Sequence, residues 1–226
     1  MFRYLLWIAP LALGACEPPD NYTYGGTPMS TLFPFDGLRT WEFIHSDTAV
    51  TYKLEAAMRR DSEKDGTINI YTVDYAKRCV AADDSCVDGE ILWSLEWSSD
   101  TTEGVRIHGS NVGDDESTWV MYEPPIVLAL SEMKVDDVVE TTTAGHTFSS
   151  TLFNFESCPV YLQAEWEDCA HIIISDVGGD QLSGYPIAGE YWAIAGRNVV
   201  AIDLETDEGL WQLSKDECEG ECNGSW

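Results

Sequence analysis

The residues best suited to chemistry in this sequence are three carboxylates in the segment DSEKDGTINIYT. Asp61, Glu63 and Asp65 alternate and Gly66 follows at a turning position, and hard cations such as calcium prefer oxygen ligands clustered in this way. However, Thr72 stands where a calcium loop supplies a bidentate glutamate, and the flanking residues predict strands instead of helices. The segment therefore predicts weak calcium binding at most. The alternative is an acidic hairpin turn built on Asp65 and Gly66.

Residues for nucleophilic catalysis form no recognisable pattern. A serine or cysteine nucleophile needs a histidine and an orienting acid beside it, and the chain contains no G-x-S-x-G motif. The four histidines lie singly, without the H-E-x-x-H or H-x-H spacing that places two imidazoles on one metal: His45, His108, His146 and His171. We therefore predict no catalytic residue, and no cofactor apart from weakly bound calcium.

The first fifteen residues predict a signal peptide. Arg3 gives a weakly basic start, and the apolar stretch from Tyr4 to Leu13 is about half the length needed to span a bilayer as a helix. Residues 17–31 then contain prolines and glycines without periodicity, which is the composition of a flexible tether. The expected organisation is a signal peptide over 1–15, a tether over 16–31 and a single domain over 32–226.

The junction Leu13-Gly14-Ala15-Cys16 resembles the lipobox of bacterial lipoproteins. This resemblance implies cleavage before Cys16 and acylation of that residue, which would tether the protein to a membrane, since two or three acyl chains make a durable anchor. Glu17, in place of the aspartate that retains such proteins in the inner membrane, favours the outer membrane. The alternative is an ordinary secretion signal that happens to include Cys16.

The other six cysteines fall in three close pairs. In an exported protein, neighbours along the chain most easily close small loops, so the predicted disulfides are Cys79–Cys86, Cys158–Cys169 and Cys218–Cys222. Zinc is the alternative, because CEGEC has ligand-like spacing, but no histidine lies near it.

Composition makes the chain acidic but well suited to folding. Removal of residues 1–15 would leave 40 acids against 11 bases, a formal charge of −29. Such a charge repels nucleic acid and anionic lipid, and it indicates either salty surroundings or a cation-binding role. Because 44% of the residues are hydrophobic, the chain can still fill one core.

The dominant hydrophobic pattern has a period of two. In EILWSLEWS, Trp93, Leu95 and Trp97 fall on one face and Ser94 and Glu96 on the other, as in a half-buried strand. A shift of the pattern in TINIYTVDY predicts a β-bulge near residue 70. Further strands are predicted over 104–109, 117–122, 137–143, 146–155, 169–175, 189–195, 198–204 and 209–213. The segment PPIVLALSEMKVDD is ambiguous between a helical turn and an extended crossing.

These strands, joined by short turns, predict an all-β fold in which antiparallel sheets form a sandwich or partial barrel. LFPFDGLRTWEF (Leu32–Phe43), the aliphatics after Pro124 and Pro125, and the closing segment Gly189–Leu213 together resemble a broad group of uncharacterised bacterial lipoproteins. The resemblance implies an all-β lipoprotein and carries no activity with it.

Two functions remain open from the sequence. The first is a non-catalytic envelope lipoprotein that binds a ligand or a partner protein through a sheet face or a cavity. The second is a hydrolase that acts on polysaccharide or peptide with paired carboxylates. Trp93, Trp97 and Trp119 could stack on sugars, although tryptophans on alternating strands usually fill the core. A cleft with converging acids would favour the hydrolase, and a filled core would favour binding.

Overall fold

Twelve strands form the protein in the computed structural model, which describes residues 33, 38–47, 49–64, 68–80, 86–160, 168–177, 186–194, 197–205 and 209–219. The strands are β1 (Leu38–His45), β2 (Tyr52–Lys64), β3 (Ile68–Cys79), β4 (Ile91–Asp100), β5 (Gly104–Val112), β6 (Val120–Ala129), β7 (Val138–Thr143), β8 (His146–Glu156), β9 (Cys169–Asp176), β10 (Gly189–Ile194), β11 (Asn198–Leu204) and β12 (Leu210–Glu219). A short 3₁₀ helix, η3 (Glu116–Thr118), precedes β6.

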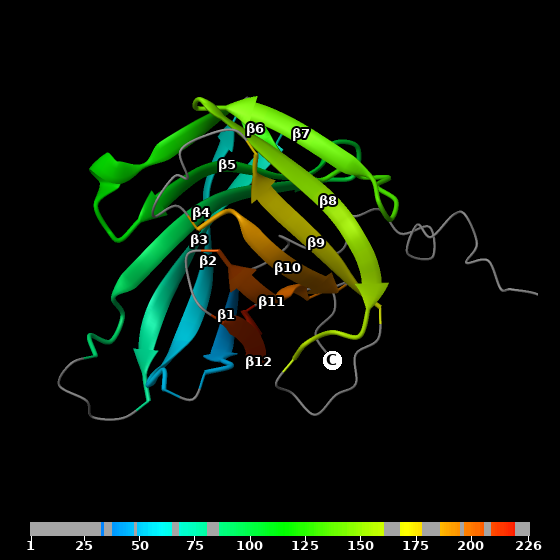
Figure 1. Ribbon diagram of the computed structural model, residues 1–226. Helices are drawn as coiled ribbons and strands as arrows, with labels where there is room; N and C mark the ends of the chain where they lie inside the picture. Colours follow the sequence, from blue (N-terminus) through cyan, green and yellow to red (C-terminus); the bar gives the residue numbers. More distant parts are fainter. Residues whose placement is uncertain are drawn as a thin grey trace, which may run out of the picture.

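All twelve strands belong to one antiparallel sheet with the order β6-β5-β4-β3-β2-β1-β12-β11-β10-β9-β8-β7. The sheet curls into a nearly closed barrel, and its two end strands, β6 and β7, lie side by side (Figure 1). The predicted all-β class is confirmed, and the sheet is a partial barrel instead of a sandwich.

Side-chain hydroxyl groups join the two ends of the sheet. The backbone N–H of Val127 on β6 donates to Thr141 Oγ1 on β7 at 3.2 Å. Ser150 on β8 donates its hydroxyl to the carbonyl oxygen of Leu128. We call this line of contact between β6 and β7 the seam.

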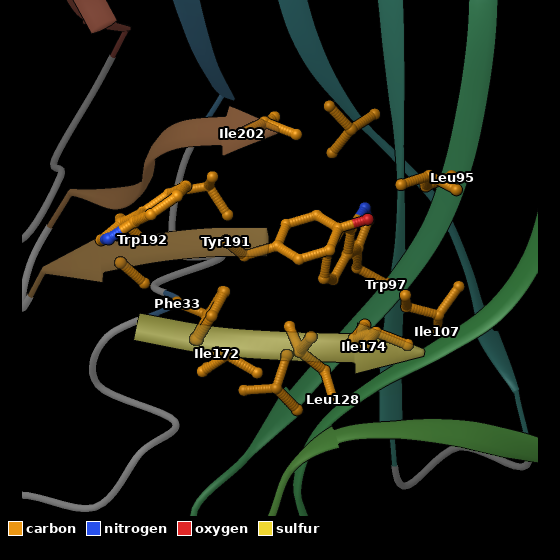
Figure 2. Packing of buried hydrophobic residues seen from close by; sticks show 14 of the residues in the cluster. Phe33, Leu95, Trp97, Ile107, Leu128, Ile172, Ile174, Tyr191, Trp192 and Ile202 are labelled. Atoms are coloured by element: carbon orange, nitrogen blue, oxygen red, sulfur yellow. The ribbon is translucent and has the colours of Figure 1, made fainter. Parts of the chain in front are cut away.

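Side chains that point inward at alternate positions of the described strands pack into one hydrophobic core. Trp97 from β4 and Tyr191 from β10 meet across it, with ring centroids 6.4 Å apart in an edge-to-face arrangement (Figure 2). Phe33, which is fully buried, stacks on Trp97 with centroids 6.3 Å apart. A residual cavity of about 10 Å³ beside Tyr75 and Asn198 has room for about one water molecule.

Buried tyrosines should make stability depend on pH in the alkaline range. Burial raises the pKa of Tyr75 and of Tyr191 above the ordinary value of 10.0. Their contribution to the free energy of unfolding is therefore fully present below pH 10. It is lost as the pH rises above 10, because the tyrosines of the unfolded chain ionise at lower pH than the buried ones. We expect Tyr75→Phe to reduce the loss of unfolding free energy between about pH 8 and about pH 10.5, measured by urea titration. An unchanged loss would contradict this, and Tyr52→Phe, at a half-buried position, is the control.

Strands from the two ends of the described chain pair in the middle of the sheet. Trp41 on β1 lies opposite Asp216 on β12. Arg39 Nη1 lies 3.5 Å, and Arg197 Nη1 3.4 Å, from the same Asp216 oxygen. Burial raises the pKa of the Asp216 carboxyl group, although the positive charges of the two guanidinium groups act to lower it. The ion cluster ties β1 to β12.

Three local features differ from the prediction or refine it. The bulge lies on β2 between Arg60 and Ser62, opposite Ile70, and not on β3 itself. The predicted strand over 117–122 begins at Val120, because Asp115 caps η3 by accepting a hydrogen bond from the Ser117 N–H. The ambiguous segment after residue 123 is extended through Ala129 as part of β6.

Candidate functional site

Three polar side chains lie next to one another on the outer face of neighbouring strands. Asp74 on β3 is opposite Ser94 on β4, and Ser94 is opposite Asn111 on β5. They point outward because the flanking residues of β4, Trp93 and Leu95, face the core. The period of the strands therefore places a carboxylate, a hydroxyl and an amide in one row.

The hydroxyl group in this row holds the carboxylate. Ser94 is only 3% exposed, and its hydroxyl donates to Asp74 Oδ1 at 2.6 Å. A hydrogen bond to an ionised acceptor is among the stronger ones in proteins, so it fixes the direction of the carboxylate.

The amide in the row holds the loop between β5 and β6. Asn111 is 3% exposed and donates to the carbonyl oxygen of Asp115 at 3.1 Å. The Thr118 hydroxyl lies against Asn111 Oδ1 and 2.7 Å from the Asp115 carbonyl oxygen. Two hydrogen bonds from Ser117 lower the pKa of the Asp115 carboxyl group. The loop is therefore ordered by its own polar groups.

A surface pocket of about 480 Å³ lies between this loop and the row of polar residues. Its volume is within the range of small-molecule sites, about 300–1,000 Å³. It is lined by Asp74, Ile91, Ser94, Asn111, Gly113, Asp114, Glu116 and Trp119. We call it the Trp119 pocket, after its one large aromatic side chain.

The Trp119 pocket combines an aromatic wall with polar groups fixed in place. The half-buried Trp119 follows directly on η3, so the cap at Asp115 helps to fix the backbone that carries its indole. Of the three tryptophans that the sequence offered for stacking, Trp93 and Trp97 are core residues, 7% and 2% exposed, and Trp119 is the one that lines this surface pocket. Such a site can stack a ligand on the indole and orient it by hydrogen bonds.

A serine and a histidine that the sequence analysis did not connect lie in contact elsewhere on the outer face. Ser98 Oγ and His108 Nε2 are 2.7 Å apart. The two residues lie ten positions apart on the β4–β5 hairpin, and the register shift that leaves His108 between Ile107 and Gly109 without a partner on β4 hides their contact in the sequence. Their exposed fractions are only 2% and 7%, and neither lines the Trp119 pocket, so the pair satisfies buried polar groups without meeting a substrate there.

Another histidine lies between two carboxylates on the outer face of β8, β9 and β10. His171 Nδ1 is 3.1 Å from Glu156 and its Nε2 is 2.8 Å from Glu190, while its ring stacks on Trp192 at 4.3 Å. Because the two carboxylates lie against opposite nitrogens of one ring, they cannot converge on one ion. Within the described ranges, no group of three or more His, Cys, Asp or Glu residues is arranged to hold a metal.

The other predicted site residues have separate outcomes. The structure contains the disulfides Cys79–Cys86 and Cys158–Cys169. Cys222 and the side chain of Cys218 lie outside the described residues. The described residues also leave out Cys16, Asp65 and the side chains of Asp61 and Glu63. The backbone of Asp61 and that of Glu63 belong to β2.

The fold and the site define an all-β protein with an acidic, tryptophan-walled pocket on the outside of its sheet. Comparisons with protein-family models, with curated proteins and with solved structures found no match for this chain. Among the described residues, no helix is both long and apolar enough to cross a membrane.

Proposed function

We propose that this protein is a non-catalytic lipoprotein of the cell envelope that binds a small polar ligand in the Trp119 pocket. The observation that carries the proposal is the pocket itself, about 480 Å³ in volume, with Trp119 on its wall and Asp74 held by Ser94. Groups fixed before a ligand arrives lose little freedom when it binds, which favours recognition.

The location rests on the start of the sequence. The short apolar run that ends at Leu13-Gly14-Ala15-Cys16 supports lipidation of Cys16, and Glu17 supports sorting to the outer membrane. The proline- and glycine-containing segment over 17–31 supports a spacer between the membrane and the domain.

The packing of the core and the surroundings of its buried acid favour binding over hydrolysis. Among the described residues, inward side chains pack into one core, and the cavity between Trp41, Tyr75 and Trp97 has room for about one water molecule. Among the described carboxyl groups, the one with a raised pKa, a mark of catalytic acids, is Asp216, which is paired with Arg39 and Arg197 and does not line the pocket.

The binding function can be tested by native mass spectrometry of the purified protein after incubation with a small-molecule extract of the cell envelope. We expect an adduct on the wild-type protein that is absent from Trp119→Ala. Met121→Ala, which shortens an exposed side chain outside the pocket lining, is the matched control and should keep the adduct. Equal adducts on all three proteins, or none on the wild type, would contradict the proposal.

The anchor is tested separately by Cys16→Ser. We expect the variant to remain uncleaved and to disappear from the outer-membrane fraction, whereas the wild type should yield an acylated amino-terminal peptide. A free amino terminus at another residue, or normal fractionation of the variant, would contradict lipidation.

A further inference from the structure

The charges around the Trp119 pocket narrow the class of its ligand. Three of the eight lining residues are carboxylic acids, Asp74, Asp114 and Glu116, and no basic residue belongs to the described lining. Asp114 and Glu116 are exposed at the rim, whereas Asp74 is partly buried beside Ser94. A ligand that enters the pocket therefore meets negative charge first at the rim and again near the strands.

Two basic side chains that follow Asp74 on β3 are engaged with other acids. Lys77 on β3 lies 2.6 Å from Glu90, and Arg78 lies 3.2 Å from Asp88. Neither of these two carboxylates lines the pocket. The chain as a whole carries a formal charge of −28, so its long-range field also favours cations.

The aromatic wall suits an organic cation better than a metal ion. An ammonium or guanidinium group is attracted to the face of an indole ring, and tryptophan is the best aromatic partner for it. A bare metal ion would need ligands that converge closely, and the described acids form no such group. A pocket of about 480 Å³ is also far larger than one ion requires.

We infer that the Trp119 pocket binds a small organic cation, with an ammonium or guanidinium group between the Asp74 carboxylate and the Trp119 ring. This inference rests on the proposed binding function and specifies the chemistry of the ligand. Asp74 supplies the charge and its direction, because Ser94 holds it, and Trp119 supplies the ring face.

The inference can be tested by calorimetry with spermidine and with triacetylspermidine, which keeps the carbon and nitrogen skeleton but removes the charges. Measurements in about 0.15 M salt screen the diffuse field of the protein. We expect saturable binding of one spermidine and at least tenfold weaker binding of the acetylated compound.

Variants separate the pocket from the general charge of the protein. Asp74→Asn keeps an oxygen that can accept from Ser94, and we expect it to weaken spermidine binding roughly tenfold, as should Trp119→Ala. Glu132→Gln removes an exposed acid outside the pocket lining and should change affinity less than about twofold. If Asp74→Asn unfolds, Glu116→Gln at the exposed rim replaces it, with an expected loss of at least threefold.

Each other outcome overturns the inference. Non-saturating binding, or equal weakening by Glu132→Gln and Asp74→Asn, would show attraction by net charge alone. Absence of spermidine binding, or equal binding of the acetylated compound, would exclude the cation preference. The proposed function would survive either result if the envelope-derived adduct is still lost from Trp119→Ala, so the two failures can be told apart.

Discussion

Replacement of Gly104 by alanine is expected to lower the free energy of unfolding by about 2–4 kcal/mol. Gly104 begins β5 with φ of 87°, and a Cβ atom there would lie 2.1 Å from the carbonyl oxygen of Ala129 and 2.8 Å from Leu130 Cα. Those atoms are backbone, and Ala129 is paired with Val105, so relief of the clash would displace the end of β6. Equilibrium unfolding in urea measures the loss.

Gly145→Ala is the matched control for this substitution. Gly145 has nearly the same conformation, with φ of 85°, but a Cβ atom there would meet nothing within 4 Å. It should therefore cost only the backbone strain of a left-handed alanine, about 1 kcal/mol. Equal losses for the two variants would contradict the steric explanation.

The second large effect is expected for Trp97→Ala, which should lower the free energy of unfolding by about 3–5 kcal/mol. Trp97 is 2% exposed and connects opposite walls of the sheet through its contacts with Phe33 and Tyr191. Its removal leaves a cavity that these rings cannot fill without a shift of the backbone that carries them. Urea unfolding gives the loss, and near-ultraviolet circular dichroism should show weakened aromatic signals.

The same substitution at Trp119 provides the comparison. Because Trp119 is half-buried at the wall of a surface pocket, Trp119→Ala should cost about 1 kcal/mol or less. A loss at Trp119 as large as that at Trp97 would mean that the indole is a structural residue. It would also remove Trp119→Ala as a test of binding.

The strands could be predicted because inward and outward positions alternate in the sequence. The faces assigned to Trp93, Leu95 and Trp97 are those that the structure shows, with all three buried. Such alternation follows from strand geometry alone and does not depend on which strands become neighbours. The local disulfide pairs in the described part of the chain were predictable for a similar reason, since both close short loops.

The pocket could not be predicted, because its residues are brought together by pairing between strands. Asp74, Ser94 and Asn111 each look like an ordinary outward polar residue, and only the registers of β3, β4 and β5 place them in one row. A register shift between Glu96 and Trp97 changes the alignment of β4 with β5 by a residue. Such shifts leave little trace in the hydrophobic pattern of a single strand.

The seam has a consequence for how copies of this protein behave together. An unpaired strand edge presents a row of N–H and C=O groups that can recruit a strand from another molecule. Here β6 and β7, which would otherwise be the two such edges, face each other, and hydroxyl groups of Thr141 and Ser150 occupy backbone groups of β6. For crowded copies of the protein, the N–H of Val127 and the carbonyl of Leu128 on β6 are thus already occupied, which hinders growth of an intermolecular sheet from this edge.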